Sequence, residues 1–283
     1  MGYKRDAERS HAASILRAMG YTVTEIEERS SPTCDLRVVL PSESMLVEVK
    51  TSRPSDEERG KLAREEPVTM TKSVGRSATM HGVLRHAAHQ IDATASTEAA
   101  GLRLVWLRIV GAGELTRSAV WFSTLYGIRW FRIMTSEVPL PANIVPCFLA
   151  DRAWFASHPE VCGVITEVGG RCGFRINPFS PAVEELRSTR LFQVLFAVGA
   201  VFGFNASKCS REFFVADPAS VVAGEQAVIR SLYERYRITV QPTTEKAYST
   251  AWPGHETGGL PGIPGHDCLI GTWDLLLRLR TPQ

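Results

Sequence analysis

Two acidic residues and a lysine lie close together within the first fifty residues. Asp35 is followed, after twelve intervening residues, by the triplet Glu48-Val49-Lys50. Carboxylate oxygens are the ligands that Mg²⁺ prefers, and a bound divalent cation polarises a phosphate and lowers the pKa of an attacking water. An ammonium group nearby orients that water or stabilises charge in the transition state. We therefore expect metal-dependent hydrolysis of a phosphodiester, in which Asp35, Glu48 and the Val49 carbonyl hold the metal and Lys50 acts on the water or the transition state.

A β-hairpin is expected to bring these residues together. With a four-residue turn at 41–44, one face of the hairpin is entirely apolar and carries Leu36, Val38, Leu40, Met45, Val47 and Val49. In this register Leu40 lies opposite Met45, Val38 opposite Val47 and Leu36 opposite Val49, because side chains alternate along a strand. The other face then places Asp35 opposite Lys50 and Arg37 opposite Glu48. The alternative is an ordinary exposed hairpin face with two cross-strand ion pairs.

The elements around the hairpin follow an α/β order. Residues 4–19 have an apolar stripe at helical spacing, and residues 21–26 alternate as a short strand does. Residues 79–95 predict another helix and residues 102–110 a buried strand, whereas the charged residues 53–72 predict a loop or a partly helical excursion. A helix, strands, a helix and a strand in this order are typical of an α/β core.

Residues 4–110 resemble the PD-(D/E)XK nuclease superfamily, with a layout similar to archaeal Holliday-junction resolvases and Mrr-like restriction enzymes. The resemblance rests on Asp35 and the triplet at 48–50, preceded by a helix and by Gly-Tyr-Thr-Val at 20–23. One departure is that Cys34 stands directly before Asp35, with Pro32 two residues earlier. The resemblance implies a restriction-endonuclease-like mixed sheet flanked by helices, a Mg²⁺ or Mn²⁺ ion, and DNA as the substrate.

The same resemblance implies roles for residues outside the motif. Glu8, in the N-terminal helix, is expected to complete the metal site, and Gln90, in the helix after the motif, is expected near the active centre. Ser31 lies in a loop where related resolvases use a serine, and the alternative for this position is a flexible polar linker.

Basic and histidine side chains near the motif are candidates for contacts with nucleic acid. They are Arg37, Lys72, Arg76 and His86. Cations of this kind neutralise backbone phosphates. The alternative is a solvated surface, because the glutamates at 57–58 and 65–66 interrupt the basic residues and because histidines often occupy exposed helix positions.

Aromatic residues are concentrated at 121–131, and a helix is expected over 118–134 with Phe122, Tyr126 and Trp130 on one face. Aromatics at helical spacing are typical of a core, and stacking on unpaired bases is the alternative. His255-Glu256 and His266-Asp267 could bind zinc, but zinc-ligand spacing is missing and an ordinary Gly/Pro loop at 253–264 is favoured.

Composition limits the class of protein. With 44% hydrophobic and 22% charged residues and a net charge of +2, the chain is typical of a soluble globular protein whose charge permits nucleic acid without demanding it. Six cysteines without a Cys-x-x-Cys pair predict reduced thiols in a cytoplasmic protein. The apolar run at 191–204 is short for a membrane span, which needs roughly 20 residues, so we expect a buried helix there and no membrane partner.

The C-terminal half gives weaker patterns. Prolines at 139–146 predict a boundary between a nuclease-like domain, residues 1–138, and an unclassified α+β region, residues 139–283, for target or partner recognition. Helices are expected at 184–206 and 226–237 and a last strand at 268–280. A catalytically inactive nuclease-like binding or scaffold subunit, an RNase or toxin, and a homodimer stay open as alternatives.

Overall fold

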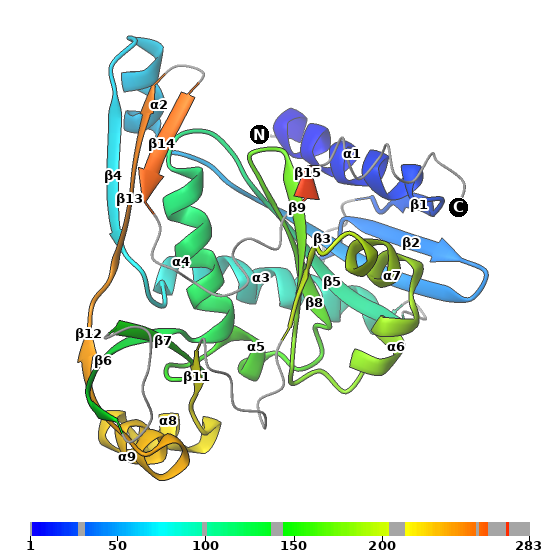
Figure 1. Ribbon diagram of the computed structural model, residues 1–283. Coiled ribbons are helices and arrows are strands. Elements are labelled where there is room, and N and C mark those ends of the chain that lie inside the picture. The colour runs from blue at the N-terminus through cyan, green and yellow to red at the C-terminus, as the bar shows by residue number, and fades with distance from the viewer. Residues whose placement is uncertain are drawn as a thin grey trace.

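A mixed sheet of eight strands forms the centre of the part of the chain that the computed structural model describes, which is residues 2–27, 32–97, 101–136, 144–203, 213–252, 255–259 and 270–271 (Figure 1). Its strands are β1 (Thr22–Glu25), β2 (Leu36–Leu40), β3 (Glu43–Ser52), β5 (Leu102–Ile109), β8 (Gly163–Val168), β9 (Arg171–Ile176), β10 (Val201–Phe202) and β15 (Ile270–Gly271). They run in the order β1-β2-β3-β5-β8-β9-β10, with β15 also paired to β9. β3, β5 and β8 are parallel, whereas β1-β2-β3 and β8-β9 are antiparallel. The fold is therefore α/β with a mixed sheet, as the sequence predicts.

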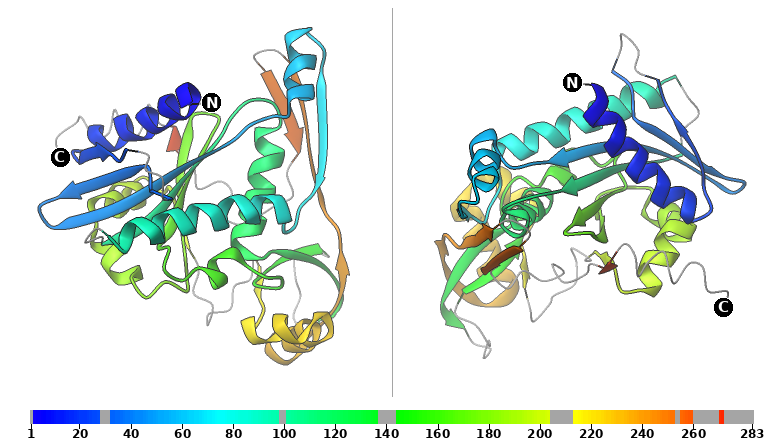
Figure 2. Two further views of the ribbon diagram at one scale, coloured as in Figure 1. Left: turned by 180° about the vertical axis from the view of Figure 1, so that it is seen from behind. Right: turned by 90° about the horizontal axis from the view of Figure 1, so that it is seen from above.

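Helices cover both faces of this sheet. One face is covered by α1 (Gly2–Ala18), α6 (Val183–Ser188) and α7 (Arg190–Ala197). The other is covered by α3 (Ala78–Ala95), α4 (Glu114–Tyr126) and α5 (Trp154–Ser157), and from behind α3 lies in front of the sheet (Figure 2). The run at 191–204 forms α7 and the short β10, and within the described residues no helix has the length and apolarity to cross a membrane.

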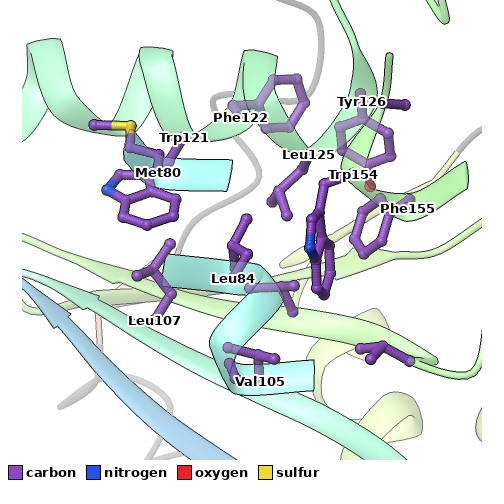
Figure 3. Close-up of a cluster of buried hydrophobic side chains, with 14 of the residues drawn as sticks. Met80, Leu84, Val105, Leu107, Trp121, Phe122, Leu125, Tyr126, Trp154 and Phe155 are labelled. Carbon is purple, nitrogen blue, oxygen red and sulfur yellow. The ribbon is translucent and has the colours of Figure 1, made fainter. Parts of the chain in front are cut away.

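Aromatic side chains fill the space between α4 and the sheet. Trp121, Phe122 and Tyr126 of α4 pack with Trp154 and Phe155 of α5 in one buried cluster (Figure 3). The rings of Tyr126 and Phe155 lie 5.1 Å apart, a separation typical of aromatic pairs in cores. The core interpretation of these aromatics is therefore confirmed, and they are not available to stack on bases.

The expected helix over 118–134 is wrong in its second half. α4 ends at Tyr126 because Gly127 adopts a left-handed conformation with φ of 60°. The chain then enters β6 (Arg129–Ser136), so Trp130 is a strand residue and does not share a helix face with Phe122 and Tyr126. A glycine in this conformation is a common helix stop.

The β2-β3 hairpin has the expected faces but a different register. Its turn has two residues, Pro41 and Ser42, so that Leu40 pairs with Glu43, Val38 with Met45 and Leu36 with Val47. The expected four-residue turn is wrong by two positions, and Arg37 lies opposite Leu46 rather than Glu48. Proline fixes φ near −65° and suits the first central position of a tight turn, which is where Pro41 lies. A shift of two residues leaves every side chain on its expected face, and the apolar face packs in the core beneath α1.

Two smaller sheets flank the central one. The first has the order β11 (Phe214–Val215), β7 (Ile144–Phe148), β6 and β12 (Ile238–Thr243), and it packs on α8 (Pro218–Ala223) and α9 (Glu225–Tyr236). The second joins β14 (His255–Gly259), β13 (Lys246–Trp252) and β4 (Val68–Ser73), with α2 (Asp56–Ala63) beside it (Figure 1). The excursion at 53–72 thus contains a helix and most of a strand, and the expected loop at 253–264 contains a strand. Of the expected last strand at 268–280, only β15 lies within the described residues.

The central sheet crosses the expected domain boundary. Its strands β1, β2, β3 and β5 come from residues before 138, whereas β8, β9 and β10 come from residues after it. β5 pairs with β3 on one side and with β8 on the other. The two halves of the sequence therefore share one sheet.

Candidate functional site

Asp35 and Glu48 meet where β2 and β3 separate. The Glu48 side chain accepts a hydrogen bond from the Asp35 backbone N–H at 3.1 Å, and the Asp35 side chain accepts one from the Val49 backbone N–H at 2.9 Å. The Asp35 carbonyl accepts from the Ile26 N–H and so continues the β1–β2 ladder by one residue. Asp35 is 2% exposed and Glu48 is fully buried. The Glu48 carboxylate is thus held by the main chain of Asp35, and the Asp35 carboxylate by the main chain of Val49.

Lys50 joins the two acids from the same face of β3. Its Nζ lies 2.5 Å from a Glu48 carboxylate oxygen and 2.7 Å from the Gln90 side-chain oxygen. The Gln90 amide in turn donates to the Thr33 carbonyl at 3.0 Å, which fixes the glutamine between α3 and the segment before β2. The four residues Asp35, Glu48, Lys50 and Gln90 come together as the sequence predicts, and we name them the acid–lysine site.

Thr94 supports this site and was not predicted. Its hydroxyl accepts from the Cys34 backbone N–H at 2.7 Å and donates to the Gln90 carbonyl at 3.0 Å. It therefore ties α3 to the residue before Asp35. The clue in the sequence was its position four residues after Gln90, which places both side chains on the same helix face.

The Cys34 thiol lies beside the two acids but stays protonated. Burial raises the pKa of Cys34 well above its usual value, and the negative charges of Glu48 and Asp35 raise it further. A thiolate is the form of cysteine that attacks electrophiles and binds metals. Cys34 is therefore a packing residue in this structure, and the chemistry of the site rests on oxygen and nitrogen groups.

The donor groups of the acid–lysine site fit a hard divalent cation. Mg²⁺ is commonly held by one or two carboxylates together with waters and substrate oxygens. Within the described ranges no group of three or more His, Cys, Asp or Glu side chains could hold a metal, so a metal here would rest on Asp35 and Glu48. The Val49 N–H points at Asp35, and in a strand the carbonyl of the same residue points to the same neighbour. The Val49 carbonyl therefore faces this site as well.

Glu8 forms an ion pair with Arg53, at the end of β3. Arg53 follows Val49 by four residues, and strand alternation places it on the α1 side of the sheet, opposite to Lys50. The structure thus connects the α1 glutamate to the strand that carries Lys50, but on the other face. Its expected role as a further metal ligand stays a prediction.

A third buried acid, Glu167, lies under α1 and was missed by the sequence reasoning. Glu167 of β8 is hydrogen-bonded to His11 Nε2 at 2.9 Å and to Trp106 Nε1 at 3.2 Å, and it forms an ion pair with Arg108, whose Nε lies 3.3 Å away. Burial acts to raise the pKa of Glu167, but the hydrogen bond and charge of His11, with Arg108 and Trp106, lower it overall. The clue was one acid within the otherwise apolar run of β8. This cluster joins α1, β5 and β8.

Replacing Glu167 with glutamine should destabilise the protein at neutral pH. Because the folded-state pKa of Glu167 is lowered, its contribution is present above the unfolded pKa and is lost as the pH falls through the folded-state pKa. We expect a loss of about 1.5–3 kcal/mol at neutral pH that shrinks as the pH falls into the acidic range. Urea unfolding at several pH values measures it, with the exposed Glu234→Gln as control. A pH-independent loss would contradict the assignment.

The residues expected to contact nucleic acid fall into separate places. Lys72, Arg76 and His86 are exposed on β4, the following loop and α3. Arg37 is exposed on the same face of β2 as Asp35 and lines a hollow of about 580 Å³ with residues 22, 24–27 and 39. Ser31 lies outside the described residues. Arg76 and His86 therefore lie just before and within α3, whereas Arg37 lies on β2.

Comparisons of this chain with protein-family models, curated proteins and solved structures found no match.

Proposed function

We propose that this protein is a divalent-metal-dependent nuclease that hydrolyses phosphodiester bonds, with DNA as the substrate. The observation that supports it is the convergence of Asp35, Glu48, Lys50 and Gln90 at one point of the sheet. Two buried acids with one lysine leave a net negative charge, which a divalent cation balances. The PD-(D/E)XK motif predicts the first three of these residues, and the resemblance to that family adds Gln90 from the helix after the motif.

Each residue has a defined part in this proposal. Asp35 and Glu48 would hold the cation, with the Val49 carbonyl beside them, and a cation held there lowers the pKa of a bound water and polarises the scissile phosphate. Lys50 places its positive charge 2.5 Å from Glu48, where it orients the nucleophile and stabilises charge on the phosphate. Gln90 holds the lysine in that position through its 2.7 Å hydrogen bond.

The test uses amide variants that keep the main-chain hydrogen bonds. Asp35→Asn and Glu48→Gln retain an oxygen that accepts from Val49 N–H or Asp35 N–H, so the hairpin should stay folded. We expect cleavage of supercoiled or linear DNA with Mg²⁺ or Mn²⁺, its abolition by EDTA, and a loss of about a hundredfold or more in either variant. Asp92→Asn is the control, because Asp92 pairs with Arg103 away from the site.

Binding of Mn²⁺, followed by electron paramagnetic resonance, provides a readout that is independent of cleavage. The unsubstituted protein should bind the ion, and both amide variants should bind it at least about tenfold more weakly, because each loses a charged ligand. Cleavage at the parental rate by both variants, with contaminating nuclease excluded, would overturn the proposal.

A second function is supported by one feature of the same site. The carboxylates already accept two main-chain N–H groups, and Lys50 already neutralises Glu48. With these hydrogen bonds and this ion pair, the cluster also holds β2 to β3 without a metal. A nuclease-like subunit that only binds nucleic acid would have such a metal-free site. Retention of DNA without cleavage of any DNA or RNA, and without Mn²⁺ binding, would favour this second function.

A further inference from the structure

The outer side of α3 carries clustered positive charge, and its one acid, Asp92, lies near the C-terminal end of the helix and is paired with Arg103. From residue 67 to residue 91 the sequence has no Asp or Glu, while it contains three cations and three histidines. Of these, Arg76, Arg85, His86 and His89 are exposed. We name the group Arg76, His81, Arg85, His86 and His89 the α3 cation surface. Viewed from behind, α3 lies in front of the sheet (Figure 2).

The cations of this surface lie close enough to act on one another. Partial burial lowers the pKa of His81, and the charges of Arg76, His158 and Arg85 lower it further. The His81 and His158 rings are 6.3 Å apart, and His158 stacks on Trp154 at 4.7 Å. Like charges gathered in this way repel one another, and a polyanion laid across them removes that repulsion.

The surface leads directly to the acid–lysine site. His86 precedes Gln90 by one helical turn, and the Gln90 side chain contacts Lys50. Because a helix rises about 1.5 Å per residue, the α3 axis from Gln90 back toward Arg76 covers about 20 Å. At about 3.4 Å per base pair this matches roughly six base pairs of B-DNA.

We propose that the α3 cation surface binds the phosphate backbone of duplex DNA and directs it into the acid–lysine site. The inference rests on the proposed nuclease function for its substrate and adds the path that the substrate takes. Arg76 and Arg85 neutralise phosphates at the far end, and His86 and His89 lie between them and Gln90. In the free protein, the charges of Arg76 and Arg85 disfavour a positive charge on His81. A bound phosphate favours that charge, so His81 takes up a proton when DNA binds.

The experiment measures DNA binding without cleavage. A fluorescently labelled duplex of about 25 base pairs is titrated in EDTA at several salt concentrations, with the unsubstituted protein, with Arg76→Ala/Arg85→Ala and with a control double variant. The control is Arg187→Ala/Arg230→Ala, which removes two exposed arginines from α6 and α9, away from α3. Single-stranded DNA and duplex RNA of the same sequence are run alongside.

Neutralising Arg76 and Arg85 should weaken duplex binding at least about tenfold at low salt. It should also reduce the slope of log K against log salt by about 1.8, because each phosphate contact contributes about 0.9. The control should change neither. The His81 resonances, followed by NMR, should titrate at a higher pH when DNA is bound, and affinity should rise as the pH falls from 8 to 6.

Unchanged affinity and unchanged salt slope in Arg76→Ala/Arg85→Ala would overturn the inference, as would equal losses in the control. Preference for single-stranded DNA or RNA over the duplex would overturn its choice of ligand. These outcomes are separable from the proposed function. If the unsubstituted protein cleaves DNA and the arginine variant binds DNA as well as it does, the proposed binding surface is rejected and the proposed nuclease function stands. If the arginine variant loses DNA binding and no form of the protein cleaves DNA, the binding surface stands and the nuclease function is rejected.

Discussion

Replacing Lys50 with alanine should reduce DNA cleavage at least about a hundredfold, because the charge that orients the nucleophile and stabilises the transition state is lost. It should also destabilise the fold. Glu48 is fully buried, and its Lys50 partner is only 17% exposed. Removing one partner of a buried pair leaves an uncompensated charge and costs about 3 kcal/mol. Both effects are measured on the same preparation, by cleavage rate and by urea unfolding.

A divalent cation should restore the stability of Lys50→Ala but not its activity. In the unsubstituted protein Lys50 already forms an ion pair with one Glu48 oxygen. A bound metal therefore stabilises the unsubstituted protein less than it stabilises the variant. We expect Mn²⁺ to raise the thermal midpoint of Lys50→Ala by more than that of the unsubstituted protein. The double variant Lys50→Ala/Glu48→Gln should recover much of the stability without metal and stay inactive. Parental cleavage by Lys50→Ala would contradict the role given to the lysine.

Replacing Gly127 with alanine should cost about 3 kcal/mol of unfolding free energy or more. Gly127 has a φ of 60°, where a side chain adds strain of about 1–2 kcal/mol. A Cβ atom there would overlap the Asp151 carbonyl oxygen and lie 2.7 Å from the Ala153 nitrogen. Both are backbone atoms, so relief requires the chain before α5 to move, which adds about 1–3 kcal/mol.

The matched control for this change is Gly199→Ala. Gly199 has a φ of 72°, but nothing lies within 4 Å of its added Cβ atom. It should therefore show the conformational strain alone, about 1–2 kcal/mol. Urea unfolding of both variants separates the strain from the overlap. Equal losses would mean that the segment at 151–153 moves freely and that the α4–α5 junction is less rigid than its packing indicates.

The acid–lysine site was predictable because local sequence patterns determine on which face of a strand or helix its side chains lie. Alternation along the hairpin places Asp35, Glu48 and Lys50 on one face in either register, since a shift of two residues preserves parity. Gln90 lies on a helix whose period is clear in the sequence. The turn length was not predictable from that alternation, because turns of two and four residues both keep the apolar face intact.

The parts that were missed depend on distant pairings. β4 has only Val68 and Met70 on its buried side, and its partner β13 lies about 180 residues later. The Glu167 cluster joins His11 to a residue 156 positions away. No periodicity in either segment indicates the other, and such pairings are set by packing of the whole chain. The end of α4 depended on one glycine, Gly127, which has a left-handed conformation and is approached so closely by residues 151–153 that no Cβ atom fits there.

The order of the strands has a consequence for how this protein is made. β5 is complete at residue 109, but its second neighbour, β8, begins at residue 163. During synthesis from the N-terminus, the edge of β5 therefore stays unpaired while more than fifty further residues are added. An unpaired parallel edge with Val105 and Leu107 beside it is prone to associate with other chains. The β2-β3 hairpin and α3 are synthesised before β8, so the residues of the acid–lysine site can come together before the β5 edge is paired. The site would then form before the central sheet is complete.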